Sequence, residues 1–462
     1  MEKDNQVTTP VYDFVRQYRE NGTARFHMPG HKGRGFLGFE DMDITEIKGA
    51  DALYESDGII AESERNATKL FDSGMTLYSA EGSSLCIKAM LYAAFRYFNV
   101  YLQETHPVIF AARNVHKSFI YAAALTDCDV VWFKTGKKPL SICSSMVTPE
   151  DVEDLFERAV IKPAAVYITS PDYLGRTADI KGIADVCHRK GVLLIVDNAH
   201  GAYLKFSEND DHPLTLGADM CCDSAHKTLP VLTGGAYLHL SKDLVSKYDY
   251  DDLYEYMKSV MCMNGSTSPS YLIMASLDKC NEYLSNKARE DIARTITKVS
   301  RIKDDLSSAG YDIVDSDPLK LTIRLHDGNI ADFVRGKNIE PEYADRDYTV
   351  FMISPFNTDE ELDRLHDALI EYSKENDVRS SEPAMEFEIV PFQTANIRFA
   401  LKEKTVTMDF EKAQGKMCGF PLVSCPPAVP IIMPGELVKK EVIEVAKYYG
   451  YEKINVVEAD YR

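Results

Sequence analysis

Two short polar segments of this chain combine residue types that can hold an aldehyde cofactor. Lys227 lies within residues 224–228, and Asp197 begins residues 197–200, each directly after a wholly apolar run that predicts a buried strand. A lysine forms a Schiff base only when its amine is neutral, so its pKa must fall from ~10.4. A carboxylate can pair with a protonated ring nitrogen of such a cofactor. Together the two residues suit a pyridoxal phosphate enzyme, although each alone is also typical of a polar turn.

A third segment and the neighbours of Lys227 could bind a phosphate. A helix is predicted over 83–97, and free backbone N–H groups at its start attract anions. The residues that could contribute donors there are Gly82, Ser83, Ser84, Ser224 and His226. A Gly-Ser-Ser sequence is also an ordinary helix cap, so the prediction depends on the combination of segments.

Two further residues could contact the faces of a cofactor ring. His116 follows the predicted strand 108–112, and its imidazole could lie flat against an aromatic ring. Ala199 is small and would allow close approach on the other face. For His116 alone, a capping or solvent-exposed role is the alternative.

Strands and helices alternate between residues 61 and 290, which indicates crossover units and a mostly parallel sheet. Helices are predicted over 149–159 and 183–189. Strands are predicted over 108–112, 130–133, 165–169, 192–197, 218–223 and 235–240. Ligands of such sheets bind outside the carboxyl ends of the strands, where the candidate residues lie.

The remainder of the chain divides into segments of different character. Residues 1–60 form a loop-rich N-terminal arm, and 61–290 form the large domain. Residues 291–379 predict a smaller α/β domain with strands over 321–325 and 348–354 and a helix over 358–372. A polar linker over 374–381 leads to a C-terminal domain over 382–462.

Composition limits the classes of function. The formal net charge of −20, from 72 acidic and 52 basic residues, argues against nucleic-acid binding and adhesion to anionic membranes. We expect a cytoplasmic protein, because no apolar run approaches the length of a membrane span and the N-terminus does not resemble a signal peptide. The ten cysteines are dilute and lack the spacing of a zinc knuckle, so neither disulfides nor a metal site are expected.

Taken together, the motifs resemble the Orn/Lys/Arg decarboxylase family. The resemblance covers nearly the whole chain and is carried by residues 9–12, 26–32, 43–46, 81–84, 114–118, 197–201, 224–229, 266–271, 425–430 and 434–436. It implies the aspartate aminotransferase-like fold of pyridoxal phosphate enzymes (fold type I), in a short form that lacks an N-terminal wing domain.

The resemblance also implies a role for each candidate residue. Lys227 carries the internal aldimine, Asp197 holds the pyridinium nitrogen and His116 stacks on the ring. The phosphate ligands are Gly82, Ser83, Ser84, Ser224 and His226. His200 occupies the place of a donor to the ring hydroxyl. Thr267 approaches the cofactor from a neighbouring subunit, which implies a homodimer or a dimer of dimers.

The activity implied is decarboxylation of arginine, lysine or ornithine to the corresponding amine and carbon dioxide. Lys227 or a nearby histidine would return a proton to the α-carbon. Glu436 is the candidate partner of the substrate's distal cation, and a turn cap after residues 434–435 is the alternative. The chain departs from the family pattern at residues 233–235 and at Ala428, which are expected in the pocket walls, so these changes bear on the choice of substrate rather than on the cofactor.

Two other functions fit parts of the pattern. An aminotransferase on the same fold would need an arginine for the substrate carboxylate, and Arg398 is the candidate. A catalytically silent regulatory paralogue would retain the fold, but the intact Lys227, Asp197 and His116 argue against it.

Overall fold

The structure is a computed structural model, and it describes residues 7–98, 107–134, 141–326, 328–379, 392–423 and 429–458. Ala428 and the rest of segment 425–428 lie outside these residues, as does the end of the predicted linker. Packing divides the chain into two compact units, which are residues 1–98 with 193–293 and residues 99–192 with 294–462. The four predicted domains, which follow chain order, stay a prediction.

The first unit contains the segments that carry Gly82, Asp197 and Lys227. Its elements are α1 (Pro10–Glu20), η1 (Leu53–Glu55), α2 (Ile59–Leu70), β1 (Met75–Ser79), α3 (Gly82–Ala93), η2 (Ala94–Phe98), β5 (Leu193–Asp197), η3 (Ala202–Phe206), β6 (Met220–Asp223), α7 (Ala225–Thr228), β7 (Ala236–Leu240), α8 (Lys242–Val245), α9 (Tyr250–Asn264) and α10 (Tyr271–Asn286). Helix α11 (Ala288–Ser308) begins in this unit and ends in the second.

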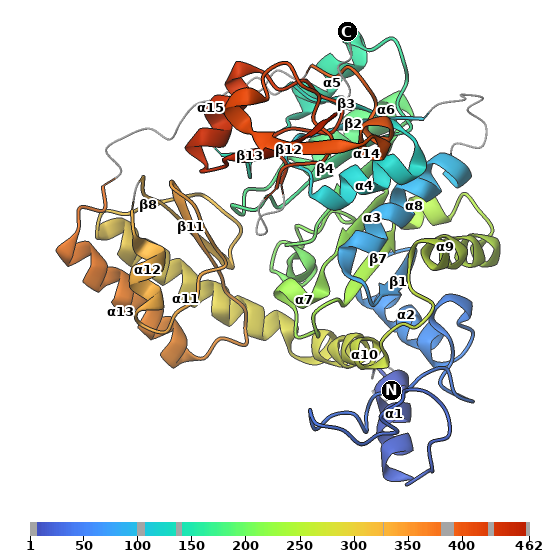
Figure 1. The fold of residues 1–462 in the computed structure, drawn as a ribbon. Helices are drawn as coiled ribbons and strands as arrows, with labels where there is room; N and C mark the ends of the chain where they lie inside the picture. Colours follow the sequence, from blue (N-terminus) through green and yellow to red (C-terminus); the bar gives the residue numbers. More distant parts are fainter. Residues whose placement is uncertain are drawn as a thin grey trace. The chain divides into compact units, whose positions relative to one another are not determined.

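The strands of the first unit follow the order β1-β7-β6-β5. β5 and β6 run parallel, with Asp197 opposite Cys222, while β7 pairs antiparallel with both β6 and β1. Every residue of β1, β6 and β7 is buried. Helix α3 packs against all three strands, and α2 and α10 also contact β1 (Figure 1). The predicted strands β5, β6 and β7 are confirmed, and β1 is an additional strand.

The second unit contains the remaining elements. They are β2 (Val108–Ala111), α4 (Lys117–Thr126), β3 (Asp129–Trp132), α5 (Pro149–Arg158), β4 (Ala165–Thr169), α6 (Ile180–Lys190), β8 (Asp312–Ile313), β9 (Lys320–Arg324), α12 (Ile330–Arg335), β10 (Tyr343–Ala344), β11 (Tyr348–Met352), α13 (Asp359–Glu375), α14 (Ile397–Lys402), β12 (Thr405–Asp409), η4 (Phe410–Lys412), α15 (Lys440–Tyr448) and β13 (Lys453–Val457).

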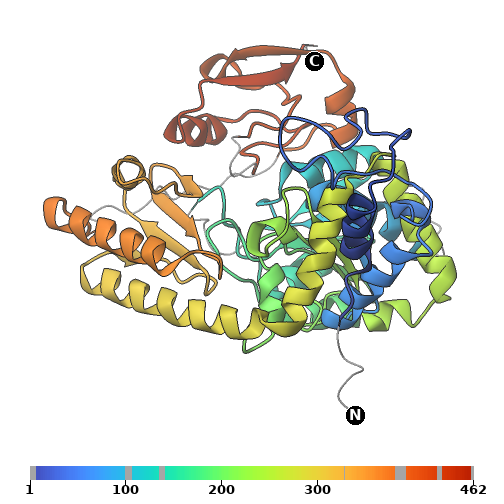
Figure 2. The same cartoon turned by 90° about the horizontal axis from the view of Figure 1, so that it is seen from below.

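Three groups of strands organise the second unit. β4, β2 and β3 run parallel in that order, as the alternating pattern predicts. β10-β11-β9-β8 form an antiparallel sheet, and β12 pairs with β13. Beside the four-stranded sheet, α11 and α13 lie side by side, joined by an ion pair of Lys298 with Asp359 and a polar contact of His366 with Asp305 (Figure 2).

Local sequence explains where several helices begin and end. Thr148 and Asp151 form a capping box at the start of α5, and Asp179 accepts the N–H of Gly182 at the start of α6. Gly191 ends α6 with φ +63°, a conformation that favours glycine. Among the described residues, no helix combines the length and apolarity needed to cross a bilayer.

Candidate functional site

The start of α3 forms an anion cradle in the first unit. Gly82 has φ +69°, and its N–H donates to the carbonyl of Gly234 at 2.6 Å. The Ser224 hydroxyl donates to Ser83 Oγ at 2.9 Å, which brings two hydroxyl groups to the first turn of the helix. A side chain on Gly82 would meet only the His226 ring, at 3.9 Å, so the space above the backbone is open. The free space above Gly82, the two hydroxyl groups and the N-terminus of the helix together could bind a phosphate group.

Lys227 contacts a histidine from a different loop. Its Nζ lies 3.1 Å from His200 Nε2, and His200 is buried. The two groups can share one proton at this distance, which is what a lysine needs to become a neutral nucleophile. His226 Nδ1 donates to the carbonyl of Gly235 at 3.0 Å, and burial followed by the charge of Lys227 lowers the pKa of His226 despite that bond. The ring of His226 is therefore neutral at pH 7.

Asp197 ends β5 and is 1% exposed. One carboxylate oxygen accepts the N–H of Ala199 at 3.2 Å and a weaker contact from the Cys222 thiol at 3.7 Å. A buried carboxylate is costly unless cationic or hydrogen-bonding partners compensate it. Asp197 can therefore hold a protonated ring nitrogen, and the small, buried Ala199 lies two residues further along the same turn.

The structure places Thr267 in the exposed loop between α9 and α10. The preceding residue, Ser266, donates its N–H to the Glu81 carboxylate at the start of α3. This loop of the same chain thus approaches the cradle. The predicted contribution of Thr267 to a neighbouring subunit stays a prediction.

Two predicted residues lie in the second unit. His116 is the N-cap of α4, where its Nδ1 accepts the N–H of Ser118 at 3.1 Å, so the capping alternative for this residue is present. Glu436 is buried and forms a bidentate ion pair with Arg113, at 2.7 and 3.1 Å, and it also accepts the N–H of Met433. The carboxylate thus has a cation from its own chain and caps its turn. Its predicted contact with substrate stays a prediction.

Sequence reasoning missed several polar residues of these regions. Arg113 directly precedes the predicted segment 114–118, and its guanidinium lies 5.4 Å from the centre of the Trp132 ring. Asp223 directly precedes Ser224 and is fully buried. Each of these two residues directly precedes a predicted motif, and this position was the signal that could have identified them. Arg398, the aminotransferase candidate, is half-exposed and lies 3.9 Å from an oxygen of Asp127.

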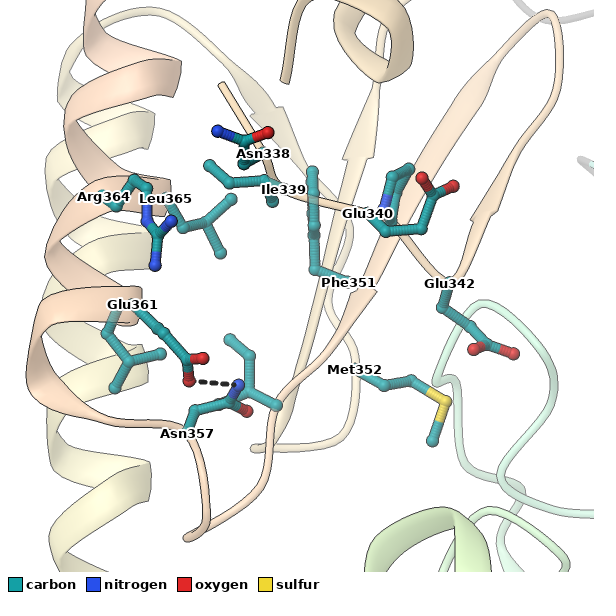
Figure 3. Close-up of a pocket in the computed structure, with 13 residues that line it drawn as sticks. Asn338, Ile339, Glu340, Glu342, Phe351, Met352, Asn357, Glu361, Arg364 and Leu365 are labelled. Carbon is teal, nitrogen blue, oxygen red and sulfur yellow. Dashed lines mark hydrogen bonds between the residues drawn. The ribbon is translucent and has the colours of Figure 1, made fainter. Parts of the chain in front are cut away.

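A pocket of about 350 Å³ in the second unit contains none of the predicted site residues (Figure 3). It lies beside α13 and β11, and Asn357 donates to Glu361 within it at 3.3 Å. Its acidic residues already have partners, since Arg335 donates to Glu340 and Tyr173 donates to Glu342. The pocket therefore does not extend the candidate site.

The donor set of the first unit fits pyridoxal phosphate. The cradle at Gly82 suits the phosphate, Lys227 suits the aldehyde and Asp197 suits the ring nitrogen. All three lie within one compact unit, at the carboxyl end of β5, just after β6 and at the start of α3.

Comparisons with known proteins agree with this fit. The family described as "Orn/Lys/Arg decarboxylase, major domain" matches residues 9–324. An arginine decarboxylase of Halalkalibacterium halodurans is 28% identical over 94% of this chain and 91% of its own length, and one of Bacillus subtilis is 27% identical over 95% and 92%. The lysine decarboxylase of Francisella novicida shares the fold, with a TM-score of 0.81 at 18% identity over 98% of this chain and 82% of its own.

These matches confirm the predicted fold, the pyridoxal phosphate-dependent aspartate aminotransferase-like fold, and the predicted cofactor. They also confirm the predicted reaction, decarboxylation of a basic amino acid. The chain belongs to the Orn/Lys/Arg decarboxylase family.

Proposed function

We propose that this enzyme decarboxylates arginine, with Lys227 as the covalent anchor of the cofactor. The proposal of arginine rests on the relatives that align along the whole chain and are named arginine decarboxylases. The proposal of the anchor rests on one observation above all, the 3.1 Å contact between Lys227 Nζ and His200 Nε2 beside the phosphate cradle.

When bound, pyridoxal phosphate withdraws electrons from the α-carbon of the amino acid, so that the bond to the carboxylate can break. The hydroxyl groups of Ser83 and Ser224 would hold the phosphate, and Gly82, whose own N–H is donated to Gly234, would leave space for it. Asp197 keeps the ring nitrogen protonated, because its buried carboxylate is stabilised by an adjacent cation. Loss of that charge would remove much of the electron withdrawal.

His200 and Lys227 transfer the protons that the reaction needs. His200 Nε2 accepts a proton from the Lys227 ammonium, which leaves the amine able to bond to carbon. After carbon dioxide departs, His200 would return that proton to the Lys227 amine, and the resulting ammonium would protonate the α-carbon. Because His226 donates Nδ1–H to Gly235, its ring would donate to the phosphate through Nε2, which would take up a proton when the phosphate binds.

The remaining assignments are parts of the same proposal. His116 stacks on the cofactor ring, Ser84 and His226 contribute to the phosphate site, and Ala199 allows the ring to lie close. Thr267 completes the site of a neighbouring subunit in a homodimer or dimer of dimers. Glu436, together with Arg113, belongs to the substrate side, and the enzyme acts in the cytoplasm.

Product analysis tests the proposal. The purified, cofactor-saturated enzyme is incubated with arginine, lysine or ornithine, without a keto acid, and the amine and carbon dioxide are measured. We expect agmatine from arginine as the fastest reaction. One methylene changes discrimination by only about 1 to 3 kcal/mol, so slow turnover of the others agrees with the proposal. Faster release of cadaverine or putrescine would overturn the choice of arginine, and dependence on a keto acid would favour an aminotransferase.

A further inference from the structure

A buried cluster of one carboxylate and two imidazoles lies in the first unit. Asp223 Oδ2 is 3.0 Å from His212 Nε2 and 3.2 Å from His239 Nε2, and all three side chains are 0% exposed. The ring of Phe71 packs against both histidines, with ring centres 5.7 and 4.4 Å apart. These contacts form a polar cluster in otherwise apolar surroundings.

The hydrogen bonds of the cluster assign its protons. His212 Nδ1 accepts the N–H of Leu214 at 3.4 Å, so His212 Nε2 carries the proton that it donates to Asp223. His239 Nδ1 lies 2.8 Å from the Thr76 hydroxyl, which can donate to it and leave Nε2–H for Asp223. Burial alone would raise the pKa of Asp223, but the two histidines hold it well below its usual range. The carboxylate is therefore ionised.

The second oxygen of this carboxylate reaches the candidate site. Asp223 Oδ1 accepts a hydrogen bond from Asn198 Nδ2 at 2.7 Å, and the Asn198 N–H donates to the carbonyl of Cys222 at 3.0 Å. Asn198 directly follows Asp197, and Asp223 directly precedes Ser224. One buried group thus joins the turn after β5 to the turn after β6.

We propose that Asp223 is a positioning residue that, through Asn198, fixes Asp197 and His200 relative to Lys227. The inference rests on the proposed function of those three residues. The two histidines orient the carboxylate and keep it charged, so that Oδ1 is always an acceptor for Asn198. Displacement of catalytic groups by about 1 Å can slow an enzyme about a hundred-fold, so such a brace affects chemistry directly.

Two variants test the proposal. Asp223→Asn keeps the size of the side chain but replaces one acceptor oxygen by an NH2 donor. That donor would face either the amide N–H of Asn198 or the N–H groups of the histidines. Asn198→Ala cuts the connection while leaving the Asp223 pairs with His212 and His239 intact, and it serves if Asp223→Asn fails to fold. Asp278→Asn is the matched control, because Asp278 is an equally buried carboxylate in the same unit that lies in α10.

Three measurements are made on the full-length holoenzyme. They are the pH at which the visible absorption band of the bound cofactor titrates, the Kd for pyridoxal phosphate, and the separate values of kcat and KM. For Asp223→Asn and Asn198→Ala we expect a displaced titration, and a kcat reduced about ten-fold or more with KM changed less than about two-fold. The control should leave the titration and kcat unchanged.

Other outcomes overturn the proposal. If Asn198→Ala titrates and turns over like the wild type, Asp223 does not act through Asn198. One equivalent of a tightly bound metal in the purified protein, lost from His239→Gln, would make the cluster a cation site instead. Failure of the proposed function is separate, because the wild-type enzyme would then lack a cofactor band that borohydride reduces.

Discussion

The carboxyl group of Asp278 predicts a pH-dependent stability of the first unit. Asp278 is fully buried, and its carboxyl accepts hydrogen bonds from the Ser63 hydroxyl and, at 2.9 Å, from the N–H of Tyr12 in α1. Burial raises the pKa of Asp278 from 3.8 to about 7, despite these donors. The folded protein therefore retains a proton that the unfolded chain has already released.

The sign of the effect follows from this difference. The contribution of Asp278 to stability is fully present below about pH 4, where both states are protonated, and it is lost as the pH rises to about 7. At about 1.4 kcal/mol per pKa unit, the whole loss is about 4 kcal/mol, of which about 3 kcal/mol falls between pH 5 and pH 8.

The variant Asp278→Asn isolates this group from the other acids of the chain. The amide keeps an oxygen for the N–H of Tyr12 but cannot ionise. Denaturant unfolding of both proteins at pH 5 and pH 8 gives the difference in their free energies of unfolding. We expect this difference to move by about 3 kcal/mol in favour of the variant at pH 8. A difference that is the same at both pH values would refute the reasoning.

Three other substitutions test buried or strained positions. Glu64→Gln leaves the buried Lys258 ammonium, which lies 2.6 Å from the Glu64 carboxylate, without its counter-charge. The substitution should reduce the free energy of unfolding by about 3 to 5 kcal/mol. An unchanged denaturation midpoint would contradict this prediction. Glu436→Gln removes the counter-charge of Arg113 in the same way, and should lower the Tm measured by thermal unfolding. Arg398→Gln, at an exposed pair, should leave the Tm almost unchanged. Gly82→Ala forces a side chain to φ +69°, costs about 1 to 2 kcal/mol and should raise the Kd for pyridoxal phosphate, measured by cofactor titration.

Much of the site could be predicted because local sequence determines it. Apolar runs identify β5 and β6, so Asp197 and Ser224 could be placed where those strands end. The helical pattern over 83–97 placed Gly82 at the start of a helix, and α3 begins at Gly82. Strand β1, which was not predicted, has the sequence Met-Thr-Leu-Tyr-Ser and is not an apolar run. Its polar residues Thr76 and Ser79 are buried because their hydroxyl groups form hydrogen bonds in the folded unit.

The contacts that could not be predicted join distant parts of the chain. Arg113 and Glu436 are 323 positions apart, and nothing in either segment identifies the other. Asp223 meets His239 because β7 pairs antiparallel with β6, a direction that the alternating pattern of the large domain did not indicate, and it meets His212 from the segment between η3 and β6. Pairings of this kind depend on tertiary packing rather than on local propensity.

The central claim is that Lys227 bonds covalently to the cofactor beside His200. It is tested most directly by reducing the holoenzyme with borohydride, digesting it and locating the modified lysine by mass spectrometry. We predict a single pyridoxyl group on Lys227 and none in Lys227→Ala. A pyridoxyl group on another lysine, such as the buried Lys258, or an unmodified Lys227 in active enzyme, would contradict the account.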